Sequence, residues 1–105
     1  MRRLVLLLLI CAGANSVQAE SSEREVLQSF LKSYCVKCHG PDKQKGDRRF
    51  DRLSAVESGA EDAELLQEIL DQLNLAAMPP EDEIQPSVAE LKTVVALLTS
   101  SLAKA

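Results

Sequence analysis

The sequence predicts an all-α fold in which three helices are joined by a long loop and a shorter one. Three stretches repeat apolar residues at the three- and four-residue spacing of one helix face, and no stretch alternates apolar and polar residues as a strand would. The chain has 105 residues and is 46% apolar, which suits one small domain and is too short for two. We therefore expect a single helical core.

The first predicted helix covers residues 21–35. Ser22 followed by Glu25 forms a capping-box pattern at its start. Its apolar stripe consists of Val26, Leu27, Phe30, Leu31 and Tyr34. The helix therefore leads directly into Cys35.

Two further helices come after a polar, aperiodic loop at residues 40–59. The second covers residues 61–77 and ends before Met78, with Leu65, Leu66, Ile69, Leu70 and Leu73 on one face. A connecting loop spans residues 81–86. The third helix covers residues 87–102, where Ser87 and Glu90 repeat the capping-box pattern before a stripe of Leu91, Val94, Val95, Leu98 and Leu102.

The first nineteen residues have the pattern of a secretory signal peptide. Arg2 and Arg3 precede an apolar run that extends to about residue 14, and Ala19 is a small residue at a plausible cleavage site. The run is shorter than the roughly 20 residues of a membrane-spanning helix, which disfavours the alternative of a retained anchor. Cys11 raises the further alternative of lipid attachment, which the bulky Ile10 before it disfavours. We expect residues 1–19 to be removed, residues 20–105 to form the domain, and the protein to be periplasmic or otherwise extracytoplasmic.

The charge of the remaining domain disfavours binding to nucleic acid. Without Arg2 and Arg3 it has ten basic and sixteen acidic side chains, a net charge of −6. An acidic surface repels the phosphate backbone. We expect no nucleic-acid partner and no stable membrane span in the mature chain.

The motif that carries chemistry is Cys35-Val36-Lys37-Cys38-His39, which contains the only histidine of the chain. Cys-x-x-Cys-His is the pattern of covalent haem attachment, in which each thiol adds to a vinyl group and the histidine binds the iron. We therefore expect one covalently attached haem c, with Cys35, Cys38 and His39 as cofactor-binding residues. Zinc binding would need a fourth ligand, a thioredoxin-like dithiol would need a βαβ pattern, and a plain disulfide leaves the histidine unexplained.

Met78 is the candidate for the second axial ligand of the iron. It is the only methionine besides the initiator and lies 39 positions after His39. Pro79 disfavours helix at Met78, and Pro80 stiffens the backbone beyond it, so the pair could hold a weak thioether ligand in place. The alternative is that Met78 fills the core and the prolines only end the second helix. We predict that His39 and Met78 are the two metal ligands.

The segments CVKCHGPDKQKGD and AAMPPEDEIQPS, together with a terminal helix, resemble the planctomycete-type cytochrome c domain, a small class I-like c-type cytochrome. The resemblance covers residues 26–102. It implies haem c held by Cys35 and Cys38, iron ligands His39 and Met78, and a first helix that crosses the last one, in a small cytochrome c-like fold around one haem. The segment GDRRFDRL carries more arginine than the family pattern Gly-x-Leu-Arg-Leu-Asp.

These features favour an electron carrier, and not an enzyme, that exchanges electrons with redox partner proteins. Iron that keeps both axial ligands reorganises little when it changes oxidation state. One alternative is a haem with an open sixth site for small-ligand sensing or peroxidase-like chemistry, which the lack of a second histidine disfavours. Another is an electron-accepting subunit of a secreted dehydrogenase.

Overall fold

The computed structural model describes residues 14–53 and 60–104, and within them the fold is all-α. Its helices are α1 (Ala14–Tyr34), the short 3₁₀ helix η1 (Lys45–Asp47), α2 (Ala60–Asn74) and α3 (Val88–Ala103). The described residues contain no strand, only an isolated antiparallel bridge between His39 and Gln44. The predicted class and the three main helices are confirmed.

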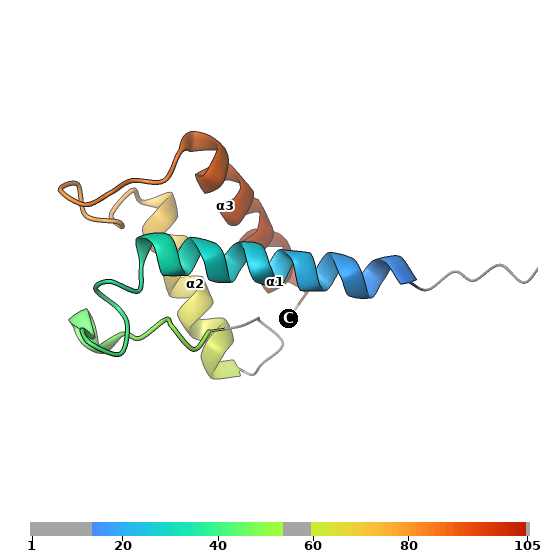
Figure 1. Ribbon diagram of the computed structural model, residues 1–105, viewed down its shortest axis with the longest axis horizontal. Helices are drawn as coiled ribbons and strands as arrows, with labels where there is room; N and C mark the ends of the chain where they lie inside the picture. Colours follow the sequence, from blue (N-terminus) through green and yellow to red (C-terminus); the bar gives the residue numbers. More distant parts are fainter. Residues whose placement is uncertain (1–13, 54–59, 105) are drawn as a thin grey trace, which may run out of the picture.

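The three long helices surround one hydrophobic core. In Figure 1, α1 runs across α2 and α3, and it contacts α3 as the family resemblance implies. The buried side chains come from all three helices and from the loop after α1: Leu27, Phe30, Leu31, Phe50, Leu53, Leu66, Ile69, Leu70, Leu73, Val94 and Leu98. Burial of this aliphatic set is the main favourable term that holds the helices together.

The predicted start of the first helix is wrong. α1 begins at Ala14, so Ser22 and Glu25 lie inside the helix and do not cap it. The physical reason is that residues 14–39 contain neither glycine nor proline, and nothing in the sequence stops the helix before Ser22. Within the predicted signal peptide, residues 1–13 lie outside the described residues and residues 14–19 form the start of α1.

The second helix ends at Asn74, three residues earlier than predicted. The Ala77 amide donates to the Gln72 carbonyl at 3.0 Å and the Ala76 amide donates to the Leu73 carbonyl at 3.1 Å, which is the hydrogen-bond pattern of a Schellman motif. Ala76 has the left-handed φ of 55° that this motif requires. The chain therefore turns away from α2 just before Met78.

The start of the third helix is confirmed. The Ser87 hydroxyl accepts a hydrogen bond from the Glu90 amide, and the Glu90 carboxylate accepts one from the Ser87 amide, both at 3.1 Å. This capping box satisfies two amides that the first turn of a helix leaves unpaired. No helix within the described ranges is both long and apolar enough to cross a membrane.

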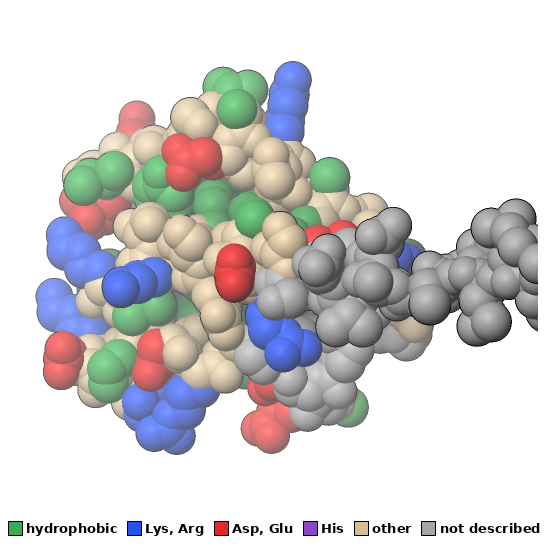
Figure 2. All heavy atoms as spheres, turned by 45° about the vertical axis from the view of Figure 1, so that its right-hand side comes forward, with side chains coloured by type: hydrophobic (Ala, Val, Ile, Leu, Met, Phe, Trp, Pro, Cys, Tyr) green, Lys and Arg blue, Asp and Glu red, His purple; other side chains and the backbone are tan. Residues whose placement is uncertain are grey.

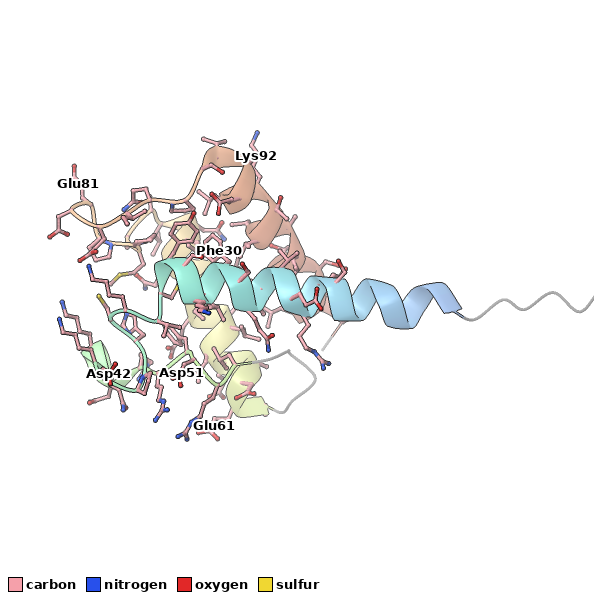
Figure 3. All side chains as sticks on the ribbon, viewed as in Figure 1. Phe30, Asp42, Asp51, Glu61, Glu81 and Lys92 are labelled. Atoms are coloured by element: carbon pink, nitrogen blue, oxygen red, sulfur yellow. The ribbon has the colours of Figure 1, made fainter. Side chains whose placement is uncertain are left out.

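Two loops lie at the same end of the molecule, where the C-terminus of α1 arrives (Figure 1). One comes directly after α1 and the other joins α2 to α3. Figure 3 shows Asp42 of the first loop and Glu81 of the second at this end. Apolar, basic and acidic side chains are interleaved on the surface there (Figure 2). The predicted site residues belong to these two loops.

Candidate functional site

Cys35, Cys38 and His39 form a tight turn directly after α1. The amides of Cys35 and Val36 both donate to the Leu31 carbonyl at 2.9 Å, and the amides of Cys38 and His39 donate to the Cys35 carbonyl at 3.2 and 3.0 Å. Both thiols are free and half-buried, and Cys35 packs against the core. The turn holds two thiols and an imidazole on a short, well-bonded segment.

Gly40 allows the chain to leave this turn. A Cβ atom at this position would lie 2.4 Å from the Val36 carbonyl oxygen and 2.8 Å from Val36 Cγ1. Neither distance is compatible with a side chain, so the close approach of the backbone after His39 requires glycine.

The His39 ring is oriented by the loop after it. His39 Nδ1 lies 3.3 Å from the Arg48 carbonyl oxygen, and because a carbonyl only accepts, Nδ1 carries the proton in this hydrogen bond. The ring packs against Phe50 with 4.8 Å between the ring centroids. The Phe50 amide donates to the His39 carbonyl at 2.8 Å, so the same segment holds the backbone. In this tautomer Nε2 has the lone pair that binds a metal.

The surroundings of Cys35 do not favour a redox dithiol. Burial, and to a lesser degree the neighbouring Cys38, raise the pKa of the Cys35 thiol to about 12. A reactive dithiol depends on a lowered pKa and a thiolate. In the described part of the chain, no group of three or more His, Cys, Asp or Glu side chains is arranged to hold a metal ion.

Met78 lies in the second loop and is 42% exposed. Pro79, the next residue, is buried, and the Glu83 amide donates to the Pro80 carbonyl at 2.9 Å. The Gln85 side-chain amide lies within 3.2 Å of the carbonyl oxygens of Pro79, Pro80 and Glu83, with the shortest contact at 2.8 Å to Pro80. One side chain therefore gathers three backbone carbonyls of the Met78 loop.

One polar contact joins the Cys35–His39 turn to the Met78 loop, and a second joins the end of α1 to α3. Lys37 Nζ lies 2.8 Å from Glu83 Oε2, and the Tyr34 hydroxyl donates to Glu90 Oε2 at 2.7 Å. The hydrogen bond from Lys37 holds the pKa of Glu83 below its ordinary value, and that from Tyr34 does the same for the pKa of Glu90. The end of α1 is thus fixed to both the second loop and the first turn of α3.

Apolar side chains are exposed in the Met78 loop and next to it. Four of the five large hydrophobic side chains exposed in the described residues lie between residues 75 and 88: Leu75, Met78, Ile84 and Val88. A concentration of exposed apolar side chains in one segment indicates a binding surface, whereas single scattered ones do not. An apolar macrocycle beside the Cys35–His39 turn is a group that these side chains could cover.

Sequence reasoning missed the residues that support the site. The Arg48 carbonyl acts through the backbone, which leaves no signature in the residue type. Gln85 and the Lys37–Glu83 pair look like ordinary polar surface residues, and only the fold places them against the motif. Phe50 could have been found, since a lone aromatic in a polar loop suggests a buried contact.

Comparison with known protein families gives a match over part of the chain. Residues 35–82 match the family model described as Planctomycete cytochrome C, a range that includes Cys35, Cys38, His39 and Met78. No curated protein and no solved structure gave a match. Over residues 35–82 the match therefore supports a planctomycete-type cytochrome c domain, and it suggests a haem c protein.

Proposed function

We propose that the protein is an exported mono-haem c-type cytochrome that transfers electrons, with His39 and Met78 as the axial ligands of the iron. The observation that carries this proposal is the hydrogen bond from His39 Nδ1 to the Arg48 carbonyl at 3.3 Å. Histidines that bind metals generally donate their other ring nitrogen to such an acceptor, which fixes the tautomer and the ring orientation. When bound, the haem supplies a one-electron iron couple.

The Cys35–His39 turn supports covalent attachment. Cys35 and Cys38 are free thiols on one turn, with His39 directly after them. Protonated thiols add to vinyl groups with no separate oxidant, since the proton and the sulfur both end on the porphyrin substituent. The hydrogen bonds of the turn hold the backbone of Cys35, Cys38 and His39, so attachment has little backbone left to order.

The Met78 loop supports ligation by a thioether. Met78 is exposed enough for its sulfur to bind a metal ion. Pro79, Pro80 and the contacts of Gln85 limit the movement of the backbone around it. The Lys37–Glu83 pair ties this loop to the turn that carries His39. A thioether is a weak ligand and gains from being held in this way.

The exposure of Met78 also favours a second candidate, a haem whose sixth position opens to a small ligand. At 42% exposure the side chain is not locked in the core. A sensor or a peroxidase-like enzyme would use such an opening. His39 is the only histidine, however, so this chain has no second imidazole to act as an acid or base there. We favour the carrier, which would act alone or as an electron-accepting subunit of a secreted dehydrogenase.

Export and a redox partner protein complete the proposal. The basic and apolar start of the sequence supports removal of residues 1–19 and an extracytoplasmic location. The acidic composition supports a protein partner and not a nucleic acid.

The test is the mass and the spectrum of the protein purified from an exporting host. We expect the denatured chain to begin after residue 19 and to retain the mass of one haem. We also expect the oxidised folded protein to show the weak sulfur-to-iron charge-transfer band of methionine ligation. A denatured mass equal to that of the polypeptide would overturn haem attachment, and a missing band would overturn the role of Met78.

A further inference from the structure

Arg48 makes two contacts that link His39 to α2. Its backbone carbonyl accepts the hydrogen bond from His39 Nδ1. Its guanidinium donates from Nε to Glu68 Oε2 at 2.6 Å and from Nη2 to Glu68 Oε1 at 3.1 Å. A single loop residue therefore touches the imidazole with its main chain and a helix with its side chain.

The pair with Glu68 is a two-point contact of fixed orientation. A guanidinium and a carboxylate joined by two parallel hydrogen bonds hold their relative plane and direction, which a single contact does not. Both side chains are nearly half exposed, at 43% and 45%, so solvent screens the attraction and its contribution to stability is small. The consequence of this contact is orientation of the loop.

Few other contacts hold the Arg48 carbonyl in place. The nearest regular element, η1, is a single turn, and the Arg48 amide donates to the Lys45 carbonyl at 3.2 Å. On the other side, Phe50 is fixed by its amide bond to the His39 carbonyl and by the contact between the two rings. Between these points the Arg49 guanidinium donates to Asp51 at 2.7 and 3.0 Å, which is a contact within the loop. The Glu68 contact is the one that ties Arg48 to a helix.

We propose that Arg48 and Glu68 are positioning residues, whose ion pair holds the Arg48 carbonyl against His39 Nδ1 and thereby sets the orientation and donor strength of the axial imidazole. This inference rests on the proposed axial role of His39. The hydrogen bond at 3.3 Å is slightly longer than the usual range of about 2.7–3.2 Å, so a small movement of the loop would break it. Losing this hydrogen bond makes the imidazole a weaker electron donor to the iron. The reduced iron is then favoured over the oxidised iron, so the reduction potential rises.

The experiment compares the reduction potentials of Glu68→Gln and Arg48→Gln in the holoprotein. If only charge mattered, the two variants would move in opposite directions, because one loses a negative charge and the other a positive charge. The positioning role predicts that both raise the potential. Glu64→Gln is the matched control, since Glu64 is exposed one turn earlier on α2 and has the same charge. It should reproduce the charge effect alone.

Hydrogen exchange supplies a readout that does not depend on the potential. In the reduced protein we expect the His39 Nδ1 proton and the Phe50 amide to exchange roughly threefold to tenfold faster in both variants, as loss of one hydrogen bond implies. Glu64→Gln should leave both rates unchanged. The double variant with Arg48→Glu and Glu68→Arg restores an ion pair of reversed polarity and should recover slow exchange.

The positioning role is wrong if Glu68→Gln and Arg48→Gln shift the reduction potential in opposite directions and neither variant changes the hydrogen-exchange rates. A poorly folded single variant does not obscure the result, because the reversed pair must then recover both folding and slow exchange. A parent chain without haem would overturn the proposed function instead, and Phe50 amide exchange in that chain would still test whether the Arg48–Glu68 pair holds the loop.

Discussion

The segments that carry His39 and Met78 are held in different ways. His39 comes shortly after α1, and backbone hydrogen bonds from Cys35 to Phe50 enclose it on both sides. Met78 is 42% exposed, and its loop depends on two prolines and the side chain of Gln85. The difference suggests that the first segment determines whether the cofactor is held at all, whereas the second determines how readily the sixth position opens.

The largest effects should separate these roles. We expect the His39→Ala variant to lack the native haem spectrum, because the chain has no other imidazole to bind the iron. Absorption spectra measure this loss.

Replacing Met78→Ala should leave the haem attached and lower the reduction potential. It should also speed carbon monoxide binding by about tenfold or more, which corresponds to about 1.4 kcal/mol or more of competing ligation. Absorption spectra, potentiometry and rapid mixing measure the attachment, the potential and the binding rate.

Met78→Leu is the matched control for the Met78 result. It keeps the approximate volume of the side chain and removes the sulfur. If the sulfur is a ligand, the leucine variant should bind carbon monoxide as fast as the alanine variant does. Equal rates in the parent and in both variants would mean that Met78 only packs, and the electron-carrier proposal would lose its main support.

A smaller effect should come from Gly40 and Gly46 in the first loop. Gly40→Ala forces a Cβ atom to within 2.4 Å of the Val36 carbonyl oxygen, so we expect a loss of about 1–3 kcal/mol in the free energy of unfolding. Gly46 has space for a methyl group but a left-handed φ of 63°, and Gly46→Ala should cost about 1 kcal/mol. Urea unfolding of both holoproteins measures the difference. Equal costs would contradict the tight approach at Gly40.

On the Met78 side, Gln85→Ala should loosen the loop without removing the ligand. The variant loses the donor shared among the carbonyls of Pro79, Pro80 and Glu83. A net hydrogen-bond contribution of about 1 kcal/mol implies carbon monoxide binding roughly threefold to tenfold faster than in the parent. Gln67→Ala is the control, because Gln67 makes a comparable 2.9 Å contact with Asp71 on α2. Similar rates in both variants would exclude a specific role for Gln85.

The sequence could predict features that depend on a residue's own side chain or on local periodicity, and it could not predict features that depend on contacts between distant segments. Helical periodicity predicted the apolar faces of α2 and α3, since Leu66, Leu70, Val94 and Leu98 are buried as expected. Cys-x-x-Cys-His and Met-Pro-Pro indicated a site because those residue types act through their own side chains. The Arg48 carbonyl, the Arg48–Glu68 pair and the start of α1 could not be predicted, because they depend on contacts between distant segments or on a stop signal that the sequence lacks.

The smallest expected effect concerns the Lys37–Glu83 contact that joins the two segments. Lys37 is the first cause of the lowered pKa of Glu83, and Lys45 and Lys43 lower that pKa further. A lowered folded-state pKa means that the contact stabilises the fold above the ordinary value of 4.5 and loses this effect as the pH falls through the folded-state pKa. We therefore expect carbon monoxide binding to the reduced protein to become modestly faster below pH 4.5.

Glu83→Gln should remove this part of the pH dependence and make the rate at neutral pH resemble the parent rate in acid. Because the Lys37 side chain is 74% exposed, 1 M salt should weaken the contact and shift the parent in the same direction. Glu81→Gln, at an exposed acid in the same loop, should keep the pH dependence. The hydrogen bond from Tyr34 also lowers the pKa of Glu90, so Glu90 contributes to the same acid dependence. Tyr34→Phe is needed to separate the contribution of Glu90 from that of Glu83. A Glu83→Gln profile that matches the parent at every pH would mean that the two segments keep their positions without this contact.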